Sequence, residues 1–308
     1  MSETVSTRYN KFSEFLKNRY GKKVQRISLN AGFSCPNLDG SLSYEGCIYC
    51  NNKSFGRNEI STPLDEQIRT GIVSAQKRYG ADRFILYFQN FSNTYAPTAA
   101  LKEKYDIIRN YSDFVCLCVG TRPDCIDEEK ADLLASYSDT VDVWVELGLQ
   151  SSNDETLKNI NRGHSYTDFE KTVKILAKRK IEVFTHVILG LPGENIEDMV
   201  KTARDISYLP IKGVKIHPLH IVKRTKLEEM FLQNEYQPMS RDTYLDYLIA
   251  FLENLRKDMI IVRITADALG DSLIAPEWIK DKTGLLKAVD IEMEKRNAFQ
   301  GKYASSGR

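Results

Sequence analysis

The sequence predicts an α/β protein built on parallel strands, and three observations support this. Short runs rich in β-branched and aromatic residues alternate with longer stretches of helical periodicity. Six such strand–helix units follow one another, which favours parallel strands joined by crossover helices. No Gly-, Ser- or Pro-rich linker interrupts them, so this span is expected to form one domain. An α/β barrel and a doubly wound sheet both satisfy this pattern.

The expected elements alternate strictly from the first strand to the sixth. The strands are expected at residues 23–30, 84–89, 114–120, 141–150, 182–190 and 213–221. The helices are expected at residues 61–80, 98–110, 127–137, 154–159, 167–179 and 196–208. The first of these helices has the clearest end signals, namely a capping Ser or Thr, a proline near the first turn and a terminal glycine.

The remaining segments flank this series. A helical pattern at 241–256, a strand at 259–267 and a charged helical tail are expected after the sixth strand. The predicted organisation is an N-terminal helical segment at 1–22, a core at 23–226, an extension at 227–300 and a disordered tail at 301–308.

The composition narrows the class of protein. The chain has 308 residues, of which 42% are hydrophobic, and its 43 Lys and Arg nearly balance its 42 Asp and Glu. We expect no secretory signal and no membrane span, because the N-terminus is polar and no run of 18 apolar residues occurs. A cytoplasmic chain keeps its thiols reduced, so its six cysteines suggest metal ligands, catalytic groups or buried packing before disulfides.

Three of these cysteines lie in one loop after the first strand. Eleven residues separate Cys35 from Cys47, and two separate Cys47 from Cys50. Three thiolates can hold a four-iron cluster and leave one iron open, whereas clusters that only carry electrons usually have four. A loop at this position lies at the C-terminal face of a barrel, where active sites form. A zinc site completed by His or Asp and a group of unliganded buried cysteines remain as alternatives.

Further motifs carry a family resemblance. They are TRPD at 121–124, ELGLQSSNDETLKNINRGHS at 146–165 and ILGLPGE at 188–194. Together with the cysteine loop, they resemble radical S-adenosylmethionine (SAM) enzymes, in particular the radical domain of the Elongator catalytic subunit and oxygen-independent coproporphyrinogen oxidases. The cysteine spacing is longer than the usual C-x3-C-x2-C of these enzymes.

The resemblance covers about residues 17–226, and it extends to the whole chain for one group of relatives. With YFQNFSNTYAP and KIHPLHIVKRT included, the chain is similar to bacterial stand-alone, Elongator-like radical proteins. This similarity implies a partial (β/α)6 TIM-like barrel with a short C-terminal strand and helix extension.

The resemblance also implies the cofactors and the reaction. Cys35, Cys47 and Cys50 would hold a [4Fe-4S] cluster whose open iron binds SAM. Reductive cleavage of SAM would then release a 5′-deoxyadenosyl radical that abstracts hydrogen from the substrate. A reductant such as flavodoxin or ferredoxin would supply the electron.

The family places its SAM contacts at positions that are polar or aromatic in this chain. The matching residues are Tyr49, Gln89, Asn90, Gln150, Arg162 and His186. Tyr49 would pack near the adenine, and the turn that begins at Gln89 would offer its backbone to the methionine amino group, although the family's glycines are missing there. Gln150 and Arg162 would meet the ribose and the methionine carboxylate, for which the planar guanidinium is well shaped. His186 would reach the ribose or adenine, with a core histidine as the alternative.

One departure from the family concerns the third strand. Gly120 stands where relatives usually have a ribose-binding Glu, and Glu146 is the candidate to replace it. Strand alternation puts Cys116, Cys118 and Gly120 on one face, which we assign to the barrel interior. A Cys118 thiol facing the site would be able to donate a hydrogen atom, and a small buried cysteine is the alternative.

The last expected strand adds basic groups to the same interior. Lys215 and His217 share a face, and His220 follows them. These three would either shape a substrate pocket or close the barrel.

Basic runs suggest an RNA partner. They lie at 11–26, 174–180 and 221–226, and Tyr9, Phe12, Phe15 and Tyr20 are interleaved near the first. This pattern suits an RNA surface, although such a run is also typical of a solvated helix face.

The favoured function is therefore radical SAM chemistry on a tRNA wobble uridine. A small metabolite such as a porphyrin as the substrate, and a non-catalytic zinc or cluster-binding module, are the alternatives. The oligomeric state is left open.

Overall fold

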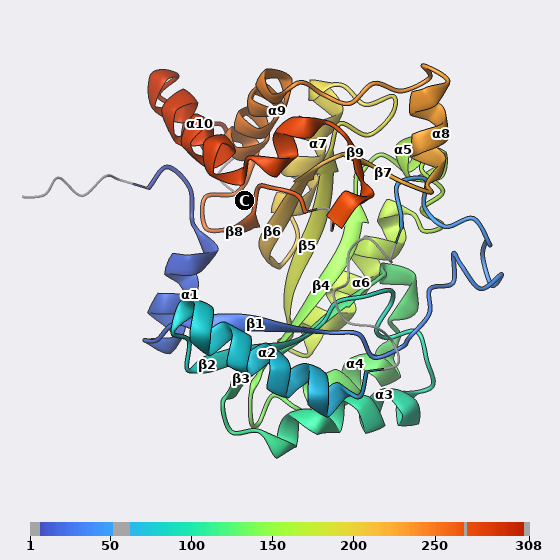
Figure 1. The fold of residues 1–308 in the computed structure, drawn as a ribbon, viewed down its shortest axis with the longest axis vertical. Helices are drawn as coiled ribbons and strands as arrows, with labels where there is room; N and C mark the ends of the chain where they lie inside the picture. The colour runs from blue at the N-terminus through green and yellow to red at the C-terminus, as the bar shows by residue number, and fades with distance from the viewer. Residues whose placement is uncertain (1–6, 52–61, 268–269, 305–308) are drawn as a thin grey trace, which may run out of the picture.

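The computed structural model describes residues 7–51, 62–267 and 270–304. At its centre, seven parallel strands curl into a half-barrel, in the order β1-β2-β3-β4-β5-β6-β8 (Figure 1). The strands are β1 (Val24–Leu29), β2 (Arg83–Phe88), β3 (Phe114–Thr121), β4 (Asp142–Gln150), β5 (Glu182–Leu189), β6 (Ile211–Pro218) and β8 (Ile260–Arg263). The predicted partial barrel is confirmed. Its seventh strand comes from the segment expected as the strand of the C-terminal extension.

Helices alternate with these strands as predicted. They are α1 (Phe12–Tyr20), α2 (Leu64–Tyr79), α3 (Thr98–Tyr105), α4 (Glu128–Ala135), α5 (Asp154–Asn159), α6 (Tyr166–Lys178), α7 (Ile196–Ser207), α8 (Lys226–Leu232), α9 (Arg241–Asn254) and α10 (Lys282–Lys295). The helix expected at 98–110 is divided, because α3 ends at Tyr105 and a 3-10 turn continues over Asp106–Asn110. A short antiparallel ribbon of β7 (Ile221–Val222) and β9 (Leu273–Ala275) lies outside the main sheet.

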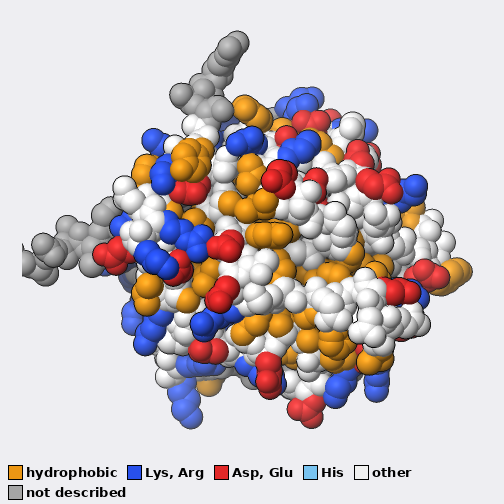
Figure 2. All heavy atoms as spheres, turned by 90° about the horizontal axis from the view of Figure 1, so that it is seen from above, with side chains coloured by type: hydrophobic (Ala, Val, Ile, Leu, Met, Phe, Trp, Pro, Cys, Tyr) orange, Lys and Arg blue, Asp and Glu red, His pale blue; other side chains and the backbone are white. Residues whose placement is uncertain are grey.

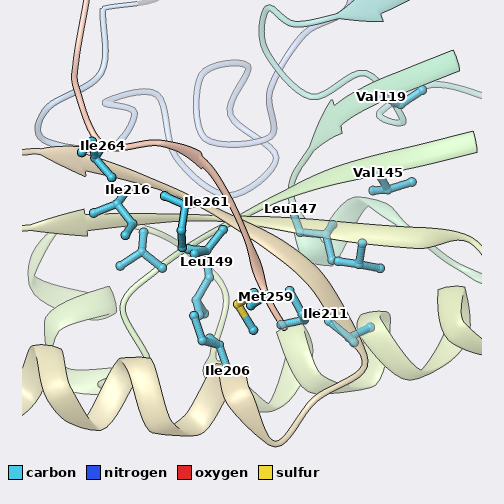
Figure 3. Close-up of a cluster of buried hydrophobic side chains, with 14 of the residues drawn as sticks. Val119, Val145, Leu147, Leu149, Ile206, Ile211, Ile216, Met259, Ile261 and Ile264 are labelled. Carbon is cyan, nitrogen blue, oxygen red and sulfur yellow. The ribbon is translucent and has the colours of Figure 1, made fainter. Parts of the chain in front are cut away.

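Alternate residues of each strand point to opposite faces of the sheet. On the outer face, Val145, Leu147 and Leu149 of β4 are fully buried, and the same cluster includes Ile206 of α7 (Figure 3). Because side chains alternate along a strand, the residue between the first two, Glu146, points into the half-barrel. The apolar core therefore lies between sheet and helices, and the interior is free to carry polar groups.

Helix α1 fills the end of the interior that lies near the amino ends of the strands. Phe12 lies 6.0 Å from Trp144 and 6.2 Å from Phe184, measured between ring centroids, and Phe15 lies 5.9 Å from Trp144. The segment before the helix runs beside β8, where the Ile261 amide donates to the Asn10 carbonyl at 2.8 Å. These rings are used in packing against aromatic side chains on the inward faces of β4 and β5, so their contacts give no support to the interpretation of them as an RNA-stacking surface.

The C-terminal residues pack beside this N-terminal segment. Gln300 accepts a hydrogen bond from the Asn10 amide at 3.0 Å and donates to the Met259 carbonyl at 2.8 Å. The Tyr303 amide donates to the Glu253 carbonyl at 2.8 Å. Of the tail predicted to be disordered, residues 305–308 lie outside the described residues. Across the described parts of the chain, no helix has the length and apolar character needed to cross a membrane.

Candidate active site

The cysteine loop follows β1, and short backbone hydrogen bonds shape it. The Leu38 amide donates to the Cys35 carbonyl at 2.8 Å, and the Gly46 amide donates to the Asn37 carbonyl at 2.7 Å. A turn in which the Cys50 amide donates to the Cys47 carbonyl at 2.8 Å brings the last two cysteines onto one side. All three cysteines line one cavity at the carboxyl ends of the strands. This is where the sequence predicted the site.

The segment after α5 holds this loop in place. Asn161 donates its side-chain amide to the Gly46 carbonyl at 2.7 Å and accepts from the Asn37 side chain at 2.6 Å through its own carbonyl. Asn161 has a φ of 52°, a left-handed conformation that Asn tolerates better than most residues. The next residue, Arg162, donates to Cys47 Sγ at 3.5 Å and to the Gly148 carbonyl at 2.6 Å. The motif around Arg162 thus connects the cysteine loop to β4.

The charges around the thiols suit a cluster bound by thiolates. Burial raises the pKa of Cys50 to about 12, and the neighbouring Cys47 and Cys35 thiols add to this shift. Arg162 and Arg122 act in the opposite sense on Cys50 and on Cys35. Both guanidiniums also keep a buried nitrogen, Arg162 Nε and Arg122 Nη1, without a hydrogen-bond partner among the described residues. These cations would offset the charge of three thiolates, so the residues present fit a cluster.

The arrangement differs from that of a single-metal site. Within residues 7–51, 62–267 and 270–304, no three His, Cys, Asp or Glu side chains gather closely enough to hold one metal ion. Three thiolates of a four-iron cluster bind different irons and do not need to converge on one point. The spacing of the three thiols is therefore compatible with a four-iron cluster.

Most of the predicted cofactor contacts line the same cavity. They are Tyr49, Gln89, Gln150, Arg162 and His186. Asn90 is buried beside this group but is not among the lining residues, whereas its neighbour Phe91 is. Phe91 has a φ of 63°, so a bulky residue occupies a left-handed turn position where glycine would be less strained. The turn forms without the family's glycines, held partly by the Asn93 side chain, which donates to the Gly120 carbonyl at 2.8 Å.

Gly148 makes room for two of these contacts. A Cβ atom at this position would lie 2.5 Å from Arg162 Nη2 and 2.8 Å from Gln150 Nε2. Gln150 itself ends β4 with a φ of 81°, which turns its side chain away from the regular strand direction. The glycine in the ELGLQ motif therefore allows Arg162 and Gln150 to lie across the strand.

Glu146 forms the centre of the cavity floor. Its carboxylate is fully buried and lies 2.7 Å from Arg26 Nη2 of β1. The Tyr87 hydroxyl of β2 donates to it at 2.7 Å, His186 of β5 at 2.6 Å and Lys215 of β6 at 3.3 Å. Although burial alone would raise its pKa, Arg26 and Lys215 hold the pKa of Glu146 well below its usual range. Five strands thus contribute side chains to one cluster, and both carboxylate oxygens are already engaged.

This placement changes two predictions for catalytic residues. The role of Glu146 as a ribose-binding residue has little support, because the protein itself provides its partners. Cys118 does point into the interior, but it is fully buried and lies 3.8 Å from Glu146 Oε1, below the cavity rather than along it. The α1 aromatics and the Glu146 cluster fill the interior up to this level, so Gly120 is the first cavity-lining position on β3.

The two histidines of the floor have defined tautomers. Burial lowers the pKa of His186 to about 4, so the ring is neutral and donates its Nε2 proton to Glu146. His217 is likewise kept neutral by burial, and the Arg263 guanidinium, which can only donate, lies 3.1 Å from its Nδ1. His217 therefore carries its proton on Nε2.

Several residues of this site were not predicted from the sequence. Arg26 was assigned to an external basic run, and Tyr87, Arg122 and Arg263 were not singled out. The signal for Arg26 was available, because a charged residue inside an apolar strand needs a buried partner. Arg263 gave no such signal, since its strand was not expected to join the sheet.

Comparison with known proteins agrees with this geometry. The family described as "Radical SAM superfamily" matches residues 44–206, and its "Radical_SAM C-terminal domain" matches residues 211–295. The first match includes Cys47 and Cys50, whereas Cys35 precedes it.

Individual relatives extend the comparison. MJ0486 of Methanocaldococcus jannaschii is 38% identical over 93% of this chain and 89% of its own length. A tRNA uridine(34) acetyltransferase of Methanocaldococcus infernus is 33% identical over 44% of this chain and 25% of its own length. The structure of archaeal Elp3 from Methanocaldococcus infernus superimposes with a TM-score of 0.69 at 21% identity, covering 91% of this chain and 64% of that one. Fold, cysteine loop and sequence match agree, and the chain belongs to the radical SAM superfamily.

Proposed function

We propose that this radical SAM enzyme modifies a base of tRNA, with the wobble uridine as the target. The observation that carries the proposal is the 33% identity to an enzyme whose name specifies tRNA uridine 34. That similarity covers 44% of the chain, so it bears on the substrate without identifying it. The Elp3-like fold is compatible with this assignment.

The chain's own residues would hold the cofactors at the carboxyl ends of the strands. Cys35, Cys47 and Cys50 would ligate the cluster, and Arg162 would be the partner for the SAM carboxylate. When bound, this cofactor pair supplies one-electron cleavage of a sulfonium and a carbon radical that takes hydrogen from the substrate. The protein would orient SAM between Gln150 and Tyr49 and keep water away from the floor, where Glu146 is fully buried.

An unpaired base is a suitable substrate for a recessed site. A base within an RNA helix is inaccessible to such a cavity, whereas anticodon bases are single-stranded and can be turned outward. The basic residues Lys223 and Arg224 follow β7, and the Asn51 side chain, one residue after Cys50, donates to the Lys223 carbonyl at 2.7 Å. They would be able to contact the RNA backbone close to Cys50.

The test begins with protein reconstituted anaerobically with iron and sulfide. After addition of dithionite and SAM, formation of 5′-deoxyadenosine is measured by chromatography, with Cys47→Ala as the control. Bulk tRNA from a strain that lacks the protein is then added, and its nucleosides are compared before and after reaction. We expect deoxyadenosine that depends on Cys47 and a changed uridine nucleoside. Deoxyadenosine with unchanged tRNA would refute the tRNA assignment and favour a small metabolite.

A further inference from the structure

Lys215 is a buried cation whose positive charge is only partly neutralised by the carboxylate beside it. Its side chain is 7% exposed, and its ammonium group lies 3.3 Å from Glu146 Oε2. That same oxygen accepts shorter hydrogen bonds from Tyr87 at 2.7 Å and from His186 at 2.6 Å. The Glu146 carboxylate also pairs with Arg26 at 2.7 Å, so one negative charge serves two cations. Burial lowers the pKa of Lys215 to about 8.

Arg263 brings a second cation to the same part of the cavity. It is the register partner of Lys215 on the neighbouring strand, and it lines the cavity with 31% of its side chain accessible. Its Nη1 lies 2.7 Å from Asp267, but Asp267 also pairs with Lys282. Its Nε has no hydrogen-bond partner among the described residues. Arg263 is therefore only partly compensated as well.

The positive and negative charges of these connected side chains do not balance. The cations that meet in this part of the molecule are Arg26, Lys215 and Arg263, and the carboxylates that they contact are Glu146 and Asp267. Three positive charges against two negative ones leave a surplus of one, and Asp267 also pairs with Lys282. Among the described residues that line the cavity, Glu146 is the one acidic side chain. Because buried charge without a partner is unfavourable, a surplus of this kind is best satisfied by an anionic ligand.

We propose that Lys215, Arg263 and the Nε2 proton of His217 form a receptor for an oxyanion of the substrate, either a carboxylate or a phosphate. All three side chains line the cavity, and all three offer donors. Arg162, the expected partner of the SAM carboxylate, lies in another part of the cavity, beside Cys47, with its Nη1 3.5 Å from Sγ. The receptor is thus formed by other residues than the SAM site and belongs to the substrate.

This inference rests on the proposed function in one respect, since it assumes that the cavity takes a substrate next to SAM. It adds that this substrate carries an acidic group. For a tRNA base, that group is an acidic substituent already present on the base or a phosphate of the same nucleotide. A neutral, unmodified base without a nearby phosphate would leave the receptor unfilled.

The test measures the melting temperature of cluster-loaded protein at saturating SAM and pH 7. Sodium acetate, sodium phosphate and sodium chloride are compared at matched ionic strength. We expect acetate or phosphate to raise the Tm by about 2–4 °C above chloride at roughly ten times its Kd, and the more effective anion identifies the source of the group. A Tm that does not distinguish the three salts would overturn the proposal, as would a receptor already filled by SAM.

The variants Lys215→Gln and Arg263→Gln locate the effect, and Lys212→Gln on the same strand is the matched control. The anion-dependent rise should vanish in either of the first two variants and persist in the control. A rise that persists in both Lys215→Gln and Arg263→Gln would sink the assignment. Binding of tRNA is measured separately, so its absence with an intact anion effect counts against the proposed function alone.

Discussion

Glu146 shows at the residue scale how the interior is held together. We expect Glu146→Gln to lower the free energy of unfolding by roughly 3–5 kcal/mol, because it leaves Arg26 and Lys215 buried without a countercharge. Urea unfolding monitored by circular dichroism measures this loss. Glu182→Gln is the control, since its pairs with Arg19 and Lys212 lie near the surface and should contribute less than about 1 kcal/mol. Equal losses in the two variants would contradict the account.

Glu194, which follows β5, gives stability a specific pH dependence. Burial raises its pKa from 4.5 to about 7, although hydrogen bonds from Ser151 and Thr156 act in the opposite sense. The folded protein therefore binds this proton more tightly than the unfolded chain, so the contribution to stability falls as the pH rises from 4.5 to 7.

Glu194→Gln removes this titration. Its stability relative to the wild type should increase by roughly 1–3 kcal/mol between pH 4.5 and 7 and then level off. Urea unfolding across this range measures the difference, with the exposed Glu197→Gln of α7 as the control. A difference that stays constant with pH would show that Glu194 ionises normally.

The structure brings together the residues whose position a motif fixed in the sequence. Cys35, Cys47, Cys50, Arg162 and Gln150 all line the predicted cavity. The sequence was less informative about the position along a strand at which the open cavity begins. Cys118 and Gly120 share a face, but only the backbone level of Gly120 and above is open, since α1 closes the interior from below. No local pattern in β3 contains that information.

At the scale of elements, α1 acts as the plug of the half-barrel. Phe12 contacts Trp144 and Phe184, and the Arg26 guanidinium lies 4.8 Å from the centre of its ring. We expect Phe12→Ala to lower the free energy of unfolding by about 2–4 kcal/mol and to shift Trp144 fluorescence to the red as water enters. Phe299→Ala, at a 40% exposed position, is the control and should do neither. An unchanged emission maximum would show that Phe12 does not seal the interior.

The elements themselves were predictable because each repeats one pattern. An apolar strand followed by an amphipathic helix occurs six times, and a capping box starts both α6 and α7. The assignment of β8 to the sheet was not predictable. It depends on α9 packing against α7 and on the N-terminal segment lying beside Ile261, both of which are contacts between residues far apart in sequence.

At the scale of the whole molecule, the fold separates basic runs that the sequence could not distinguish. Lys223 lies beside Asn51, which follows Cys50, whereas residues 174–180 form the end of α6 and the turn after it, where Arg179 already pairs with Glu128 and Asp132. On the face seen in Figure 2, basic side chains lie among acidic ones rather than forming one continuous area. On this face, an RNA contact is therefore expected to be local, and the basic residues beside the cysteine loop are the candidates for it.

This arrangement predicts which lysines and arginines determine the salt dependence of tRNA binding. Each phosphate that the protein neutralises releases a counterion, so the slope of log K against log salt reports the number of contacts. The double variant Lys223→Gln/Arg224→Gln should weaken binding and reduce that slope by about 1–2, and the control Lys174→Gln/Lys178→Gln on α6 should leave it unchanged. Filter binding of tRNA from about 50 to 200 mM salt measures both quantities. Equal effects of the two double variants would mean that the outer helices also bind RNA, away from the cysteines. That result would contradict the proposal that the cavity takes a tRNA base.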